Sequence, residues 1–95
     1  MISEITVDQL VDYIREDNPD ESVKKQISIM RAAAISYMTG YTGQTAEYLD
    51  EHDEFDAVLM VLVADMYDNR SLIVDNDKQN PFVMSVLDMH RVNLL

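Results

Sequence analysis

The sequence predicts a small all-α protein, a bundle of three main helices followed by a short C-terminal helix and a tail. Apolar residues recur every three or four positions through most of the chain, which is the period of one face of an α-helix. Residues that cap helices, and two prolines, mark where these segments begin. Because a chain of 95 residues supports only one hydrophobic core, we expect residues 1–95 to form a single domain.

The first helix is predicted over residues 6–16. Thr6 and Gln9 have the spacing of a capping box, in which each side chain satisfies a backbone N–H group at the start of the helix. A single apolar stripe follows at helical spacing. Its predicted core residues are Leu10 and Ile14.

The second helix is predicted over residues 20–40. An acidic break that contains Pro19 precedes it, and proline suits the first position of a helix. The chain's two glycines, Gly40 and Gly43, lie where this helix is expected to stop. Its predicted core residues are Ile27 and Met30.

Residues 44–49 are predicted to form a connector, and the third helix is predicted over residues 51–69. Acidic side chains gather at its start, where the helix dipole favours negative charge. Its apolar residues form one stripe that faces the core. The predicted core residues of this helix are Leu59, Leu62 and Met66.

The third helix also carries apolar residues on its other side. A helix that is apolar on two sides has to be buried on two sides. This second stripe is therefore predicted to be a subunit interface, and the alternative that the last segment of the chain folds back over it remains open. The stripe consists of Ala57, Met60, Val61 and Ala64.

The C-terminal part begins with a polar stretch, residues 71–80, that is expected to be an exposed loop. Pro81 then opens a short final helix or turn, because proline suits a helix start. The tail after it shows no core periodicity, so it forms a short strand or an arm that docks elsewhere.

The charge distribution limits the possible partners. Eighteen acidic residues against seven Lys and Arg give a net charge of −11, whereas a nucleic-acid-binding protein needs the reverse balance to neutralise phosphates. No Lys or Arg occurs between Ala32 and Asn69, so one region of the surface is expected to be strongly negative. The sequence therefore argues against direct binding of DNA.

Compartment and membrane association are also constrained. The chain has no cysteine, so disulfides, thiolate catalysis and Cys-ligated zinc are excluded. Its first residues are acidic where a secretory signal would be basic, and no apolar run is long enough to span a bilayer. We expect a soluble, cytoplasmic protein without a membrane partner.

Candidate catalytic and metal-binding patterns are weak. His52 and Asp56 stand four residues apart, a spacing that can bind a metal, but the only other histidine, His90, lies far along the chain. The segment that begins at Asp75 resembles the start of a calcium loop, but Asn80 stands where the loop requires glycine. No nucleophile elbow or phosphate-binding loop occurs. We expect no catalytic residue, cofactor or metal, and a protein that is not an enzyme.

A series of motifs follows in a set order along the chain. They are a short helix (residues 6–15), an acidic break (residues 17–21), the end of a long helix (Tyr41-Thr42-Gly43), an apolar helix that ends with Tyr, Asn and Arg (residues 57–70), and a closing segment that contains Pro81, Leu87 and Arg91. In order, spacing and total length, these motifs resemble the head–tail connector (adaptor) family of tailed bacteriophages. The resemblance covers nearly the whole chain.

The resemblance implies a structural subunit of a phage or prophage. Such subunits form a homo-oligomeric ring below the portal protein after DNA packaging, extend the channel, and join it to a tail-side completion protein. DNA would pass through without specific binding, and the ring would lie at the head–tail junction of the virion after assembly in the bacterial cytoplasm. A helix with two apolar sides suits such a ring, because one side can contact a neighbouring subunit.

Two further sets of residues are predicted to function in this ring. The portal-docking tail is expected to consist of Arg91, Val92, Leu94 and Leu95. The acids expected to face the channel are Glu47, Asp50, Glu51, Asp53 and Glu54. The alternative that these acids are capping and solubility charges on an outer surface remains open, because acids are favourable at any helix start.

A different class of function fits the same charge. An acidic DNA mimic, or a regulatory protein that binds a nucleic-acid-binding partner, would present carboxylates in a phosphate-like array. It would not need a second apolar stripe on the third helix. A mimic is expected to be a monomer and a connector to assemble.

Overall fold

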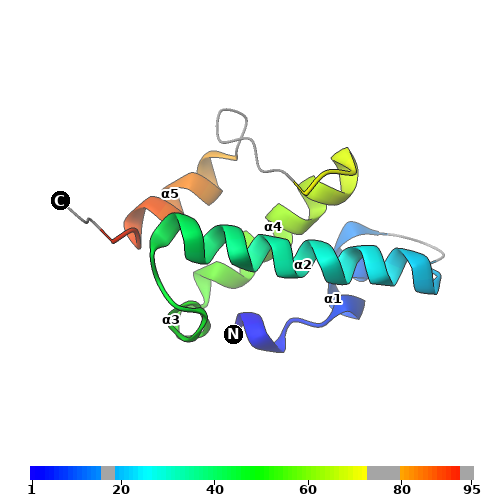
Figure 1. Cartoon of the computed structure of the whole chain (residues 1–95), viewed down its shortest axis with the longest axis horizontal. Helices are drawn as coiled ribbons and strands as arrows, with labels where there is room; N and C mark the ends of the chain where they lie inside the picture. The colour runs from blue at the N-terminus through cyan, green and yellow to red at the C-terminus, as the bar shows by residue number, and fades with distance from the viewer. Residues whose placement is uncertain (16–18, 73–79, 93–95) are drawn as a thin grey trace.

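The computed structural model describes residues 1–15, 19–72 and 80–92, and in these ranges it contains helices and no strand. In chain order the elements are the 3₁₀ turn η1 (Ile2–Glu4) and the helices α1 (Val7–Ile14), α2 (Glu21–Thr42), α3 (Ala46–Asp50), α4 (Glu54–Asn69) and α5 (Pro81–Met89). Helix α2 runs along the length of the molecule, and the other helices lie against it (Figure 1). The prediction of an all-α bundle is confirmed.

Side-chain caps explain why the first helices begin where they do. The capping box of α1 is present, with Gln9 N donating to Thr6 Oγ1 at 3.1 Å and Thr6 N donating to Gln9 Oε1 at 2.9 Å. Asp20 caps α2 by accepting a hydrogen bond from Val23 N at 2.8 Å. Helix α1 is shorter than predicted, because Arg15 adopts the left-handed conformation with φ of 65° and ends the helix after Ile14.

The end of α2 and the segment after it correct the sequence prediction. The helix continues through Gly40 to Thr42, and only Gly43, with φ of 74°, ends it. The prediction of a connector over residues 44–49 was wrong, because Thr45 caps the five-residue helix α3 by accepting from Tyr48 N at 3.1 Å. Helix α4 begins at Glu54 instead of residue 51.

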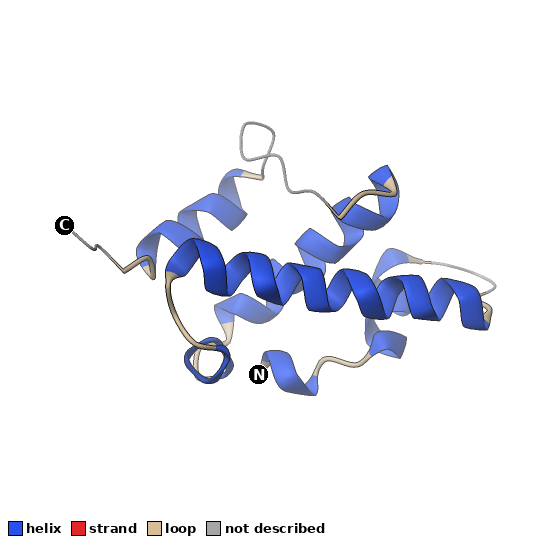
Figure 2. Cartoon of the chain, in the orientation of Figure 1, coloured by secondary structure: helices blue, strands red, loops and turns tan. Residues whose placement is uncertain are grey.

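The core is built around α4, which packs against α1, α2 and α5 (Figure 2). Of the residues predicted for the core, Ile14 is only half-buried, since α1 ends there, and the others are buried. Arg31 fastens the N-terminal segment by donating from Nη2 to Ile2 O at 2.9 Å and from Nε to Ile5 O at 3.0 Å. The buried residues of α4 are Phe55, Val58, Leu59, Leu62, Val63, Met66 and Tyr67.

The C-terminal segment returns to the body of the molecule. Helix α5 starts with Pro81, and Asn80 caps it by accepting from Phe82 N at 2.8 Å. It packs on α4 and α2 through buried residues that include Leu87. After α5, Val92 N donates to Thr42 O at 2.7 Å.

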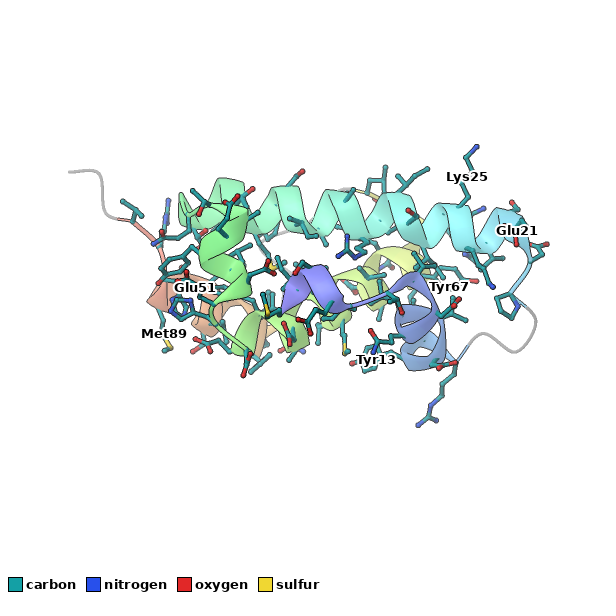
Figure 3. The ribbon with its side chains drawn as sticks, turned by 90° about the horizontal axis from the view of Figure 1, so that it is seen from below. Tyr13, Glu21, Lys25, Glu51, Tyr67 and Met89 are labelled. Atoms are coloured by element: carbon teal, nitrogen blue, oxygen red, sulfur yellow. The ribbon has the colours of Figure 1, made fainter. Side chains whose placement is uncertain are left out.

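The domain measures 47 × 28 × 18 Å, so its two ends are well separated. One end, here called the acidic end, comprises α3, the start of α4 and the end of α5, and Figure 3 shows Glu51 and Met89 there. The opposite end comprises α1, the first half of α2 and the end of α4, and carries Lys25 and Tyr67 (Figure 3). It is here called the groove end, because a groove lies there between α2 and the end of α4. None of the described helices is long and apolar enough to cross a membrane.

Candidate functional site

The acids predicted to face a channel all lie at the acidic end, on α3 and around the start of α4. Four of them are exposed, and Asp50 is half-buried. These carboxylates lie in one region of the surface, whereas Asp65 and Asp68 of the same cation-free stretch lie on the last turns of α4, at the groove end. The exposed acids are Glu47, Glu51, Asp53 and Glu54.

Some of the carboxylates at the acidic end bind the N-terminal segment. Asp50 Oδ1 accepts a hydrogen bond from the backbone N–H of Ser3 at 2.8 Å. Asp56 Oδ2 lies 3.0 Å from the amino group of Met1, and Asp53 lies 3.9 Å from it. Part of the negative charge therefore holds the fold together, so it is not all free for a partner.

His90 is the centre of a hydrogen-bond network that joins three helices. Its Nδ1 lies 2.8 Å from the hydroxyl of Tyr48 on α3, and its Nε2 lies 2.6 Å from Glu54 Oε1 at the start of α4. Its carbonyl oxygen accepts from Gln44 Nε2 at 2.9 Å. A neutral His90 that carries its proton on Nε2 satisfies both side-chain contacts, because it donates to Glu54 and accepts from Tyr48.

The same network affects the ionisation of Glu54. A hydrogen bond from its own backbone N–H, and then the hydrogen bond with His90, lower the pKa of the Glu54 carboxyl below its usual value. Both bonds favour the charged form. Glu54 is therefore held as a carboxylate at neutral pH.

The fold brings together the two histidines that are far apart in the sequence. The rings of His52 and His90 lie 4.9 Å apart, and the His52 ring stacks on Tyr48 at 4.3 Å. His52 Nδ1 lies 2.9 Å from the carbonyl oxygen of Tyr48, and Phe55 completes the aromatic cluster. The sequence carried no signal for this pairing, because it arises only when the end of α5 returns to α3.

The chemistry open to this cluster is limited by its own bonds. Both ring nitrogens of His90 are engaged by Tyr48 and Glu54, so neither is left to take a proton from a bound molecule. Asp56, the predicted metal partner of His52, contacts the amino group of Met1. Over the described ranges no group of three His, Asp or Glu side chains is placed to hold a metal.

The second apolar stripe of α4 is partly covered. Ala57 is exposed, whereas Met60, Val61 and Ala64 are half-buried, and Met60 and Val61 pack against the edge of the core. A subunit contact here remains a prediction, centred on Ala57. Large apolar side chains that are exposed elsewhere include Ile29, Leu72, Phe82 and Met89.

The predicted portal-docking tail is divided by the structure. The guanidinium of Arg91 lies 4.9 Å from the ring centre of Tyr41, and Val92 is bonded to Thr42. These two tail residues are thus docked on their own domain. Leu94 and Leu95 lie outside the described residues.

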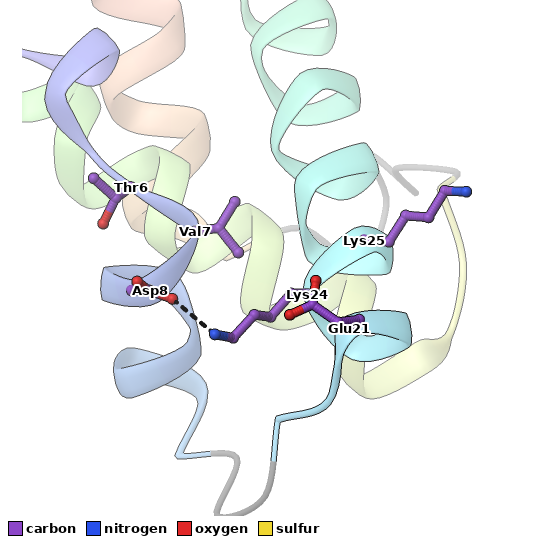
Figure 4. Close-up of a pocket in the computed structure, with 6 residues that line it drawn as sticks. All are labelled: Thr6, Val7, Asp8, Glu21, Lys24 and Lys25. Atoms are coloured by element: carbon purple, nitrogen blue, oxygen red, sulfur yellow. Dashed lines mark ion pairs between the residues drawn. The ribbon is translucent and has the colours of Figure 1, made fainter.

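A cleft at the groove end separates the starts of α1 and α2 (Figure 4). Its volume is about 480 Å³, and Lys24 Nζ lies 3.5 Å from Asp8 Oδ1 across it. Two lysines and two acids line this cleft, so their charges balance and favour neither anions nor cations. The residues are Thr6, Val7, Asp8, Glu21, Lys24 and Lys25.

Comparison of the chain with protein-family models, with curated proteins and with solved structures found no match.

Proposed function

We propose that this protein is a structural head–tail connector subunit of a tailed phage or prophage. It forms a ring below the portal protein, extends the DNA channel and meets a tail-side completion protein, without catalysing a reaction. The observation that carries the proposal is the position of the family-like motifs, which lie at helix ends and join distant segments of this fold.

The Tyr41-Thr42-Gly43 step ends α2 and receives the C-terminal segment. The hydroxyl of Tyr41 donates to Asp88 Oδ1 at 2.5 Å, and the buried Thr42 hydroxyl donates to Met38 O at 2.7 Å. The left-handed Gly43 then turns the chain toward α3. Each residue of the motif has a separate structural task, which supports the view that the motif belongs to this architecture.

The motif at the end of α4 has similar tasks. Arg70 adopts the left-handed conformation with φ of 51° and closes the helix, and its guanidinium lies 4.0 Å over the ring of Tyr67. Asn69 Nδ2 donates to the carbonyl oxygen of Asp65 at 2.9 Å, one turn earlier. The closing motif begins with Pro81 in the first turn of α5.

The charge of the acidic end suits a channel that DNA passes through. Glu47, Glu51 and Asp53 are exposed, and carboxylates repel phosphates. If these acids converge in the lumen of a ring, their mutual repulsion destabilises it. Such rings would be more stable at high salt, because the Debye length falls from about 10 Å at 0.1 M to about 3 Å at 1 M.

Electron microscopy of the purified protein, alone and with its portal protein, tests the proposal directly. We expect rings coaxial with the portal. Ala57→Glu tests whether the second apolar stripe of α4 is a subunit contact. Ala57 is exposed, so this change leaves the core intact, whereas Val61→Glu would place a charge on a half-buried position. A protein that forms a ring neither alone nor on the portal overturns the proposal.

The exposed carboxylates also favour the second candidate, an acidic mimic of DNA. Such a mimic acts as a single subunit and binds a positively charged partner in a salt-dependent manner. Light scattering separates the two functions, because a strict monomer that competes with DNA for a basic protein supports the mimic. An assembly that ignores DNA-binding proteins supports the connector.

A further inference from the structure

A groove lies between α2 and the end of α4, at the groove end of the molecule. Its volume is about 380 Å³. Ile29 and Leu72 on its rim are 49% and 51% exposed, which is high for large apolar side chains. The groove is lined by Gln26, Ile29, Met30, Arg70 and Leu72.

Among the described residues that line this groove, Arg70 is the charged one. Its guanidinium lies over the Tyr67 ring, and it forms no hydrogen bond or ion pair with any described residue. Among the described residues no carboxylate pairs with this cation, so it is available to an acid from outside the chain. Arginine pairs strongly with carboxylates, so the groove suits an apolar side chain that is accompanied by an acid.

The acidic end offers such a group. Met89, the last residue of α5, is 74% exposed, and Glu51 is exposed at the same end of the molecule (Figure 3). Methionine is unbranched and flexible, so its side chain adapts to an irregular groove. The exposed carboxylate of Glu54 lies 2.6 Å from Nε2 of His90, the residue that follows Met89. Met89 and Glu54, here called the knob, place apolar surface and negative charge in one region.

We propose that the groove of one copy of this chain receives the knob of a second copy. Met89 would pack between Ile29 and Leu72, and the carboxylates around it would approach Arg70. This inference rests on the proposed connector function and identifies the contact that would build its ring. Burial of apolar surface from both copies favours the contact, and the opposite charges select its orientation.

The position of the two surfaces determines the kind of assembly. Groove and knob lie toward opposite ends of the molecule, so a chain cannot fill its own groove (Figure 3). Because the two surfaces differ, the contact is heterologous and each copy uses one groove and one knob. A reciprocal antiparallel pair, in which each copy fills the other's groove, would close as a two-fold dimer, whereas one contact per pair of copies, repeated, gives the ring or open filament that the connector function requires.

A mixing experiment with two variants tests this geometry. Ile29→Asp blocks the groove and leaves the knob, whereas Met89→Lys blocks the knob, because its cation is repelled by Arg70, and leaves the groove. By light scattering, we expect the wild-type chain to assemble and each variant alone to remain a monomer. An equimolar mixture should give a single species of twice the 10.9 kDa subunit mass, because one intact knob meets one intact groove.

Controls separate this contact from a loss of folding. Tyr13→Asp is a matched control, because Tyr13 is 48% exposed and lies on α1, outside the groove and the knob. It should assemble as the wild type does. Leu72→Asp should behave as Ile29→Asp does, with an apparent dissociation constant at least about tenfold higher. Circular dichroism and the Tm show that each variant is folded.

The outcomes also distinguish this proposal from the connector function. The contact is wrong if either variant alone keeps the wild-type mass, if the mixture stays monomeric, or if the wild type does not self-associate in solution. Rings on the portal in any of these cases leave the connector function standing. Absence of rings both in solution and on the portal overturns the function as well.

Discussion

The two ends of this domain are each stabilised by a different kind of interaction. At the acidic end, side-chain hydrogen bonds join residues far apart in the chain, such as Ser3 with Asp50 and Tyr48 with His90. At the groove end, α1 and α2 are held by apolar packing and by caps that act within each helix. The ion pair that joins these helices in the described part of the chain, Lys24 with Asp8, is exposed.

This difference indicates how the negative charge is used. Exposed ion pairs contribute little to stability, so the charges of the groove end could change without much effect. The half-buried Asp50 and the Glu54 bonded to His90 are part of the structure, whereas Glu47 and Glu51 remain on the surface. Exposed acids and acids that stabilise the fold therefore occupy the same region.

The largest effect is expected in the core that both ends share. Leu62 is 1% exposed at the middle of α4, so Leu62→Ala should lower the free energy of unfolding by about 2–5 kcal/mol through lost burial and a cavity. Urea denaturation measures the loss. Leu72→Ala, at an exposed leucine of the groove, is the control and should change it by less than about 0.5 kcal/mol. Equal losses in the two variants would contradict the core assignment.

His90→Ala tests the network of the acidic end. The change removes the hydrogen bonds to Tyr48 and Glu54 and should cost about 1–3 kcal/mol in urea denaturation. Lys24→Ala makes the matched change at the groove end, where an exposed pair is lost, and should cost less than about 0.5 kcal/mol. If the two variants lose the same stability, the ends do not differ as described.

The two glycines of α2 predict effects of opposite sign. Gly43→Ala places a Cβ on a residue with φ of 74°, 3.4 Å from Val92 Cβ, and should cost about 1–2 kcal/mol. Gly40 lies inside the helix with no neighbour within 4 Å of an added Cβ, so Gly40→Ala should stabilise by about 0.5–1 kcal/mol. Thermal denaturation of both variants measures the two shifts, and a Gly43→Ala protein as stable as the wild type would refute the left-handed conformation of Gly43.

The smallest effect concerns pH. The pKa of the Glu54 carboxyl is lower in the folded chain than its unfolded value of about 4.5. The stability that the charged Glu54 contributes is therefore fully present above pH 4.5, and it is lost as the pH falls through the folded pKa. The difference in unfolding free energy between wild type and Glu54→Gln should therefore shrink below pH 4.5. A difference that stays constant down to the acid limit of folding would show that neither the backbone N–H nor His90 lowers this pKa.

Much of the architecture followed from local patterns. The capping box of Thr6 and Gln9, the Pro81 start and the spacing of Leu59 and Leu62 placed helices and core residues correctly, because they act within a few residues of sequence. The same patterns missed α3. Thr45 capped a helix too short to show a periodicity of its own.

The candidate surfaces depended on the tertiary structure. The sequence by itself determined the helical class, the core stripe of α4 and the uneven charge, since these follow from residue type and spacing. Only the folded chain decided that His52 and His90 meet and that Arg70 borders an apolar groove with Ile29. Such juxtapositions join residues from separate helices, and their distances are set by how α2, α4 and α5 pack, which no local pattern encodes.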